Sequence, residues 1–146
     1  MRPGPASRPD QQDPARAARI DAAEIAWIVS KRGAAMRSRD ADWLAARYLP
    51  GAPVIGPTPP VTRIADPALD ATRIWDWFEL LQGRIRWTVR IESLQLAEDT
   101  AVCRTVERAS YRELCRARVR PAFETTIGLC RVDGRWRIAW ETAIGV

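Results

Sequence analysis

The sequence predicts a single α+β domain in which three N-terminal helices pack on a strongly curved, mixed but mainly antiparallel sheet. Apolar residues recur at helical spacing only before residue 83, whereas from residue 85 onwards they alternate with polar residues, as in half-buried strands. Short turns separate these strands, as in an antiparallel meander. The 146 residues, of which 47% are hydrophobic, are enough for one core.

The first helix is predicted from its cap and its apolar stripe. Residues 1–13 are rich in proline, glycine and arginine, which predicts a flexible tail before a domain that spans residues 14–146. Asp13 and Pro14 are the residue types that favour an N-cap and the first helical position, so a helix is expected from there to about Ser38. Its buried stripe consists of Ile25, Ile28, Val29, Arg32 and Met36.

Two further helices are expected before residue 83. Asp40 is a typical cap for a short helix that ends at Pro50-Gly51, and this helix carries Trp43, Leu44, Arg47 and Tyr48. The segment PVIGPTPP then indicates a brief strand and a loop. Asp66-Pro67 repeats the capping signal. The inward stripe that follows, ended by Gly83, is Ile74, Trp77, Phe78 and Leu81.

Four long strands are expected after Gly83. The first covers residues 85–91, and the second covers about 101–111 after a turn. A loop leads to the third strand at about 120–132. Asp133-Gly134 is a strong signal for a hairpin turn, so the last strand pairs with the third.

The composition excludes several classes of function. The absence of histidine removes the usual general base and the commonest metal ligand. Cys103, Cys115 and Cys130 form no C-x-x-C pair, which indicates neither a disulfide framework nor a zinc site. The arginines behind the net charge of +5 are spread over every segment, which argues against nucleic-acid binding. No signal peptide, membrane span or nucleotide motif is found, so we expect a cytoplasmic protein with no cofactor and no metal.

Two stretches of the chain resemble a known superfamily. RSRDADWLAARYLPGAPVIGPTPP and FETTIGLCRVDGRWRIAWET are similar to the SnoaL-like branch of the nuclear-transport-factor-2-like superfamily, which also contains polyketide cyclases, ketosteroid isomerases and scytalone dehydratase. The resemblance spans about residues 20–146 and implies a cystatin-like cone with one pocket. It leaves the activity open, because this fold carries both enzymes and non-catalytic binders.

The same resemblance shows where this chain departs from its relatives. Gly56 and Gly128 stand where ketosteroid isomerases have a catalytic aspartate and an oxyanion-hole acid, which argues against that chemistry. Trp140 and Thr142 stand where many SnoaL-like relatives have histidine. Glu124 stands where relatives often have arginine, which implies a local reversal of charge in the pocket.

Counting outward from the Asp133-Gly134 turn gives a predicted register for the last hairpin. The expected pairs are Val132 with Arg135, Thr126 with Glu141, and Glu124 with Ala143. Both glutamates then share one face, and Trp136 and Trp140 share the other. Residue types alone leave open which face is core. The resemblance implies that the glutamates line the pocket and that the tryptophan face forms a homodimer interface.

Arg32 supports a pocket that contains carboxylates. An arginine in a buried stripe is costly unless a carboxylate meets it, and Glu124 and Glu141 are the expected partners. Two interpretations follow. The pair is either a structural salt bridge, or a catalytic set in which a glutamate transfers protons and Arg32 stabilises an anion.

The predicted function is cofactor-independent acid–base catalysis on a small apolar or polycyclic molecule, such as a cyclisation, isomerisation or dehydration in secondary metabolism. The expected catalytic residues are Glu141, Glu124 and Arg32. The expected ligand-binding residues are Tyr48, Thr126, Arg104, Trp77, Trp87 and Trp27. The alternative is a non-catalytic small-molecule-binding or partner subunit of the same fold. A glutamate in a pocket beside Arg32 favours the enzyme.

Overall fold

The computed structural model describes residues 13–56 and 71–146. In chain order its elements are α1 (Pro14–Ser38), α2 (Ala41–Arg47), β1 (Val54–Ile55), α3 (Ala71–Leu80), β2 (Arg86–Leu96), β3 (Thr100–Ser110), β4 (Ala122–Val132) and β5 (Arg135–Gly145). The predicted tail lies outside the described residues except for Asp13, and so does the predicted cap at Asp66-Pro67.

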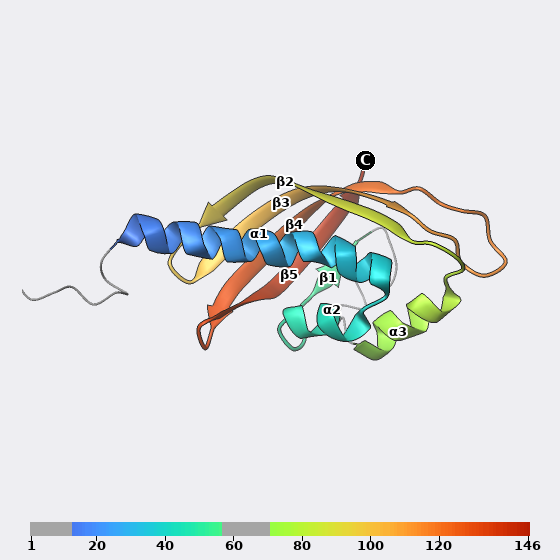
Figure 1. Cartoon of the computed structure of the whole chain (residues 1–146), viewed down its shortest axis with the longest axis horizontal. Helices are drawn as coiled ribbons and strands as arrows, with labels where there is room; N and C mark the ends of the chain where they lie inside the picture. Colours follow the sequence, from blue (N-terminus) through green and yellow to red (C-terminus); the bar gives the residue numbers. More distant parts are fainter. Residues whose placement is uncertain (1–12, 57–70) are drawn as a thin grey trace, which may run out of the picture.

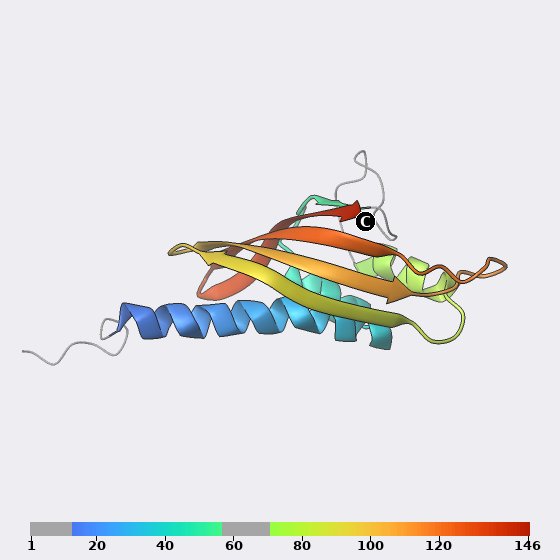
Figure 2. The ribbon, with the colours of Figure 1, turned by 90° about the horizontal axis from the view of Figure 1, so that it is seen from above.

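The predicted α+β architecture is confirmed. The three helices pack on an open five-stranded sheet whose strand order is β1-β5-β4-β3-β2. β1 runs parallel to β5, and the other neighbours are antiparallel, so the sheet is mixed. Figure 1 shows α1 running across the sheet, with α2 and α3 near its C-terminal end. Figure 2 shows the twist of the long strands above α1.

Both caps that lie in the described residues form as expected. The Asp13 carboxylate accepts hydrogen bonds from the backbone N–H groups of Ala15 and Arg16, and Asp40 accepts one from Trp43. Arg39 takes a left-handed conformation between the two helices, with φ of 57°. The chain therefore turns directly from α1 into α2.

The core lies between the helices and the sheet face turned toward them, which we call the inner face. All five residues of the α1 stripe and all four of the α3 stripe are buried. From the sheet, the core receives Trp87, Cys103, Ile127, Trp136 and Ile138 among others. Gly33 lets α1 approach β2 closely, because a Cβ there would lie 3.2 Å from the Cγ2 of Val89.

The last hairpin starts in the predicted register but does not keep it. Asp133 and Gly134 both have positive φ, 51° and 76°, as a tight hairpin turn requires. Val132 pairs with Arg135 as expected. Beyond that, Leu129 pairs with Ile138 but Gly128 pairs with Trp140, so Ala139 is an extra residue in β5.

This β-bulge overturns the two remaining predicted pairs. Glu141 lies opposite Ile127 instead of Thr126, and Glu124 lies opposite Ile144 instead of Ala143. One extra residue reverses which face each later side chain shares with the partner strand. The prediction that Glu124 and Glu141 share a face was therefore wrong.

The predicted tryptophan face was wrong for the same reason. Trp136 is in the core, whereas Trp140 is 36% exposed on the opposite, outer face, where its indole covers Gly128. Trp27 also lies outside the core. It is 54% exposed on α1, contacts Trp43 edge to face and lies close to the ammonium group of Lys31.

Candidate functional site

The inner face carries one buried charged cluster, in which Arg32 lies between two glutamates. Its Nη1 is 3.2 Å from Oε2 of Glu107, and its Nη2 is 2.9 Å from Oε1 of Glu141. The exposed fractions are 6% for Arg32, 0% for Glu107 and 9% for Glu141. Residues from α1, β3 and β5 therefore meet in the core, and the carboxylates outnumber the guanidinium.

Each glutamate also accepts hydrogen bonds from neutral side chains. Tyr48, at the end of α2, donates a 2.8 Å bond to Oε1 of Glu141. Glu107 accepts bonds from Nε1 of Trp87, at 3.0 Å, and from the hydroxyl of Thr105, at 2.7 Å. Both oxygens of Glu107 are thus engaged, whereas only Oε1 of Glu141 takes part in the bonds found in the described residues.

The backbone around Glu141 explains how β5 delivers this side chain. On the edge of β5 next to β1, the Leu49 N–H donates to the carbonyl of Ile138, and the Glu141 N–H donates to the carbonyl of Pro53. The bulge at Ala139 lies between these two attachments. The segment between α2 and β1 therefore holds β5 on either side of the bulge, next to Tyr48.

The two carboxyl groups have pKa values that shift in opposite directions. Burial raises the pKa of Glu141, and the negative charge of Glu107 adds to this, against the opposing effects of Arg32 and Tyr48. Burial acts in the same direction on Glu107, but the charge of Arg32 and the bonds from Trp87 and Thr105 outweigh it and lower the pKa of Glu107. Glu141 is therefore the more readily protonated of the two carboxyl groups, and Glu107 is the one that more readily stays ionised.

Comparison with solved structures identifies the fold. The chain is similar to Kfla4162 from Kribbella flavida, with 14% identity, a TM-score of 0.72, and coverage of 88% of this chain and 92% of that one. It is also similar to a nuclear transport factor 2-like superfamily protein from Salmonella enterica, with 11% identity, a TM-score of 0.67, and coverage of 88% and 92%. The chain has the nuclear transport factor 2-like fold.

A third protein with the nuclear transport factor 2-like fold is a proposed dehydratase from Streptomyces avermitilis. It is 15% identical, with a TM-score of 0.68 and coverage of 88% of this chain and 97% of that one. No protein-family model and no curated protein matches the sequence. At these identities the likeness defines the fold alone.

Three of the predicted site residues meet on the inner side of this nuclear transport factor 2-like fold. The expected ion pair between Arg32 and Glu141 is confirmed, and Tyr48 joins it through Glu141. Trp87 lies beside them through Glu107. Trp77 is also in the core, where its ring contacts Tyr111 edge to face with the centroids 5.2 Å apart.

The structure separates the other predicted site residues from this cluster. Glu124 and Arg104 are exposed on the outer face, where they line one shallow pocket. Thr126 follows the same outward phase of β4 and is half-buried. Arg104 lies outward, against its expected place in the pocket, because the inward residues of β3 are Ala101, Cys103, Thr105, Glu107 and Ala109. Trp27 is on the exposed side of α1.

Glu107 is the member of the cluster that the sequence analysis missed. A signal for it exists in the residue types of β3. Its odd-numbered positions are mostly small or apolar, whereas the even-numbered ones include Arg104 and Arg108. Taking the odd positions as buried would have brought Glu107 inside, opposite the buried Arg32.

Two further observations concern metal binding and membrane-spanning helices. In the described part of the chain, no group of three or more Cys, Asp or Glu side chains is arranged to bind a metal ion. No helix in the described ranges is long and apolar enough to cross a membrane. The chemistry that the cluster itself offers is proton transfer by a carboxyl group next to a fixed positive charge.

Proposed function

We propose that the protein is a cofactor-independent acid–base enzyme that isomerises, cyclises or dehydrates a small apolar organic molecule. The observation that carries this proposal is the pair of buried glutamates on one guanidinium, with pKa values shifted apart. Such a separation divides the roles between a group that exchanges protons and one that stays charged. Glu141 takes the first role and Glu107 the second.

In the proposed mechanism, Glu141 acts through its Oε2 atom. As a carboxylate it removes a proton from a carbon next to a substrate carbonyl, and the electron pair of the C–H bond forms an enolate. The protonated Glu141 then returns the proton to another carbon, which isomerises the substrate, or gives it to a leaving hydroxyl, which leaves as water in a dehydration. Neither reaction requires an external oxidant or a cofactor.

Arg32 and Tyr48 support these steps by holding Glu141 and compensating charge. Tyr48 donates to the same oxygen that Arg32 contacts, which leaves the other oxygen of Glu141 for the substrate. The Nε of Arg32 is buried and has no hydrogen-bond partner in the described residues, so a substrate oxygen would satisfy it. Glu107 is a positioning residue, because it acts through Arg32.

Deuterium exchange tests the proposal without knowledge of the natural substrate. Cyclic ketones and β-hydroxy ketones are incubated with the protein in D2O, and incorporation at the α-carbon is followed by mass spectrometry. We expect exchange that falls roughly 100-fold or more in Glu141→Gln, since general base catalysis contributes effects of this size. Glu124→Gln is the matched control on the outer face and should exchange at the wild-type rate. Equal rates in both variants would remove Glu141 from the mechanism.

The alternative function is a non-catalytic binding subunit. The nearly complete burial of Glu107 and Arg32 favours it, because a structural ion pair needs no access to substrate. In that case a ketone ligand would broaden or shift the NMR signals of Tyr48 and Trp87 without any exchange in D2O.

We further propose that the protein is a cytoplasmic homodimer that associates through the outer face of the sheet at β5. Trp140 and Ile144 are large apolar side chains exposed on this strand. The three cysteines are free thiols, as expected in a reducing compartment. Sedimentation of Trp140→Glu tests the interface: a dimer that persists unchanged would contradict it.

A further inference from the structure

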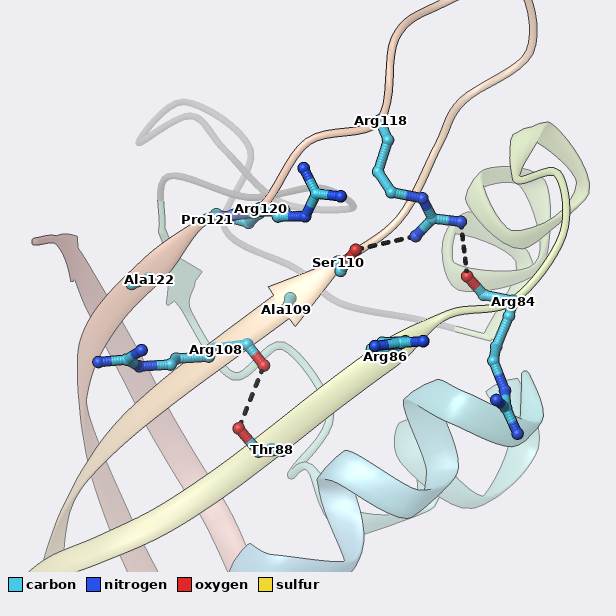
Figure 3. A pocket seen from close by; sticks show the side chains of 10 residues that line it. All are labelled: Arg84, Arg86, Thr88, Arg108, Ala109, Ser110, Arg118, Arg120, Pro121 and Ala122. Carbon is cyan, nitrogen blue, oxygen red and sulfur yellow. Dashed lines mark hydrogen bonds between the residues drawn. The ribbon is translucent and has the colours of Figure 1, made fainter.

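The outer side of the sheet contains a groove of about 590 Å³ at the end where the loop between β3 and β4 projects. Arg86 and Thr88 from β2 and Arg108 and Ser110 from β3 line it, together with Arg118 and Arg120 from the loop that precedes β4. Figure 3 shows these side chains around the hollow, with Arg84 at its rim. The groove lies on the opposite face of the sheet from Glu107, since the residues of β2 and β3 alternate between the faces.

The lining of the groove is strongly and uniformly basic. It includes five arginines, at positions 84, 86, 108, 118 and 120, and no aspartate or glutamate. In the described part of the chain, none of the five forms an ion pair with a carboxylate. By contrast, Arg90, which lies on β2 like Arg86, forms an ion pair with Glu92. Guanidinium groups gathered without counter-charges repel each other, so a bound anion would stabilise this end of the sheet.

One wall of the groove is held in place by the fold. Arg118 is half-buried, and it donates one hydrogen bond to the hydroxyl of Ser110, at 2.9 Å, and one to the backbone carbonyl of Arg84, at 3.2 Å. These two bonds connect the loop to β3 and to the chain just before β2 (Figure 3). The arginine positions are thus partly organised before any ligand arrives, which lowers the entropic cost of binding.

The chemistry of the lining favours phosphate groups. Guanidinium groups bind phosphate oxygens through paired N–H donors, and several of them around one hollow suit an anion with more than one such group. The hollow has the volume of a small-molecule site. Its remaining lining is Thr88, Ser110, Ala109, Pro121 and Ala122, with no aromatic ring on which a nucleic-acid base would stack.

We propose that this groove binds a small anion that carries two or more phosphate groups. The even spread of arginines along the sequence conceals this site, because the pairing of β2 with β3 places residue 108 diagonally across from residue 86 and the loop adds residues 118 and 120. The proposal is independent of the acid–base chemistry on the inner face.

Calorimetric titration with inorganic tripolyphosphate tests the proposal on the full chain. We expect saturable binding to one site in low salt, weakened by added salt as for any contact with several charges. The double variant Arg86→Ala/Arg108→Ala removes two exposed cations that make no side-chain hydrogen bond in the described residues, so folding should be retained. Its affinity should fall about tenfold or more, since it loses two charge-assisted contacts to the phosphate oxygens.

The matched control is Arg16→Ala/Arg135→Ala, which removes the same charge from exposed positions outside the groove. It should bind tripolyphosphate within about twofold of the wild type, as surface charges far from a site are largely screened. Equal loss in both double variants would mean that only net charge matters and would overturn the site. Failure of the wild-type protein to bind would overturn it as well. Tighter binding of a single-stranded oligonucleotide that depends on the same arginines would replace the small anion with nucleic acid.

Discussion

Tyr48 donates a 2.8 Å hydrogen bond to Oε1 of Glu141, the same oxygen that lies 2.9 Å from Nη2 of Arg32. A phenol and a guanidinium thus share one oxygen of a buried carboxyl group. Both contacts favour the ionised form of Glu141, whereas burial and the charge of Glu107 oppose it. The protonation state of Glu141 is therefore a balance that single substitutions can move in a known direction.

Tyr48→Phe should raise the pKa of Glu141 further. The substitution removes a hydrogen bond that favours the carboxylate and leaves the ring packed. The stability at neutral pH should also fall by about 1.5–3 kcal/mol, the usual value of a hydrogen bond to a charged group. Titration of the Glu141 carboxyl carbon by NMR measures the shift. Tyr111→Phe is the control, because its ring contacts Trp77 and no hydrogen bond of its hydroxyl is found in the described residues. An unchanged Glu141 pKa in Tyr48→Phe would contradict the balance described above.

Glu141→Gln should gain stability relative to the wild type as the pH rises. The folded-state pKa of Glu141 is raised, so the folded chain holds this proton more tightly than the unfolded chain does. The wild type therefore loses stability as the pH rises from the ordinary glutamate pKa to the raised pKa of Glu141 in the folded protein. The glutamine variant does not show this loss, because its side chain has no proton to release. Glu107 has a lowered pKa, so its contribution to stability is lost as the pH falls. Both proteins contain Glu107, so this contribution does not distinguish them. Urea denaturation at about pH 5 and about pH 8 measures the difference. Glu124→Gln should show no such trend, and a pH-independent difference for Glu141→Gln would be inconsistent with a raised pKa.

Arg32→Met should destabilise the protein by about 3–5 kcal/mol, because it leaves two buried carboxylates without their cation. Arg131→Met is a matched control, since Arg131 also contacts two carboxylates, Asp21 at 2.8 Å and Asp99 at 3.2 Å, but is partly exposed. Its loss should cost about 1 kcal/mol or less, as is typical of solvent-screened pairs. Denaturation of both variants at neutral pH gives the comparison. Equal costs would show that the burial of the Arg32 cluster has no energetic consequence.

The helices and the general architecture could be predicted because their signals are local. The caps Asp13 and Asp40 and the stripes of α1 and α3 depend on residues within a few turns of each other. The ion pair between Arg32 and Glu141 could also be predicted, since a buried arginine requires a carboxylate. The helices follow from the spacing of apolar residues within one element, and the ion pair follows from the free energy needed to bury one charge.

The faces of β3 and β5 could not be derived in the same way. Counting residues outward from the Asp133-Gly134 turn assumes regular pairing of β4 with β5. The single extra residue Ala139 breaks this regularity and reverses the face assigned to each residue of β5 beyond it. The attachments of Leu49 and Pro53 to β5, on either side of Ala139, come from segments far away in the sequence. Glu107 was missed because Arg104 was taken as a ligand-binding residue, which requires the opposite phase of β3 and turns Glu107 outward.

Gly128→Ala should test the bulged register directly. In the structure a Cβ at Gly128 would lie 2.0 Å from Nε1 of Trp140, because the bulge brings this indole across the glycine on the outer face. The methyl group must therefore displace the Trp140 ring, and overpacking of this kind costs about 1–3 kcal/mol. Denaturation of Gly128→Ala, Trp140→Leu and the double variant gives the coupling energy. The cost of the alanine should largely disappear when the ring is absent. Had the hairpin kept the regular register, Trp140 would not face Gly128, and the two substitutions would be additive.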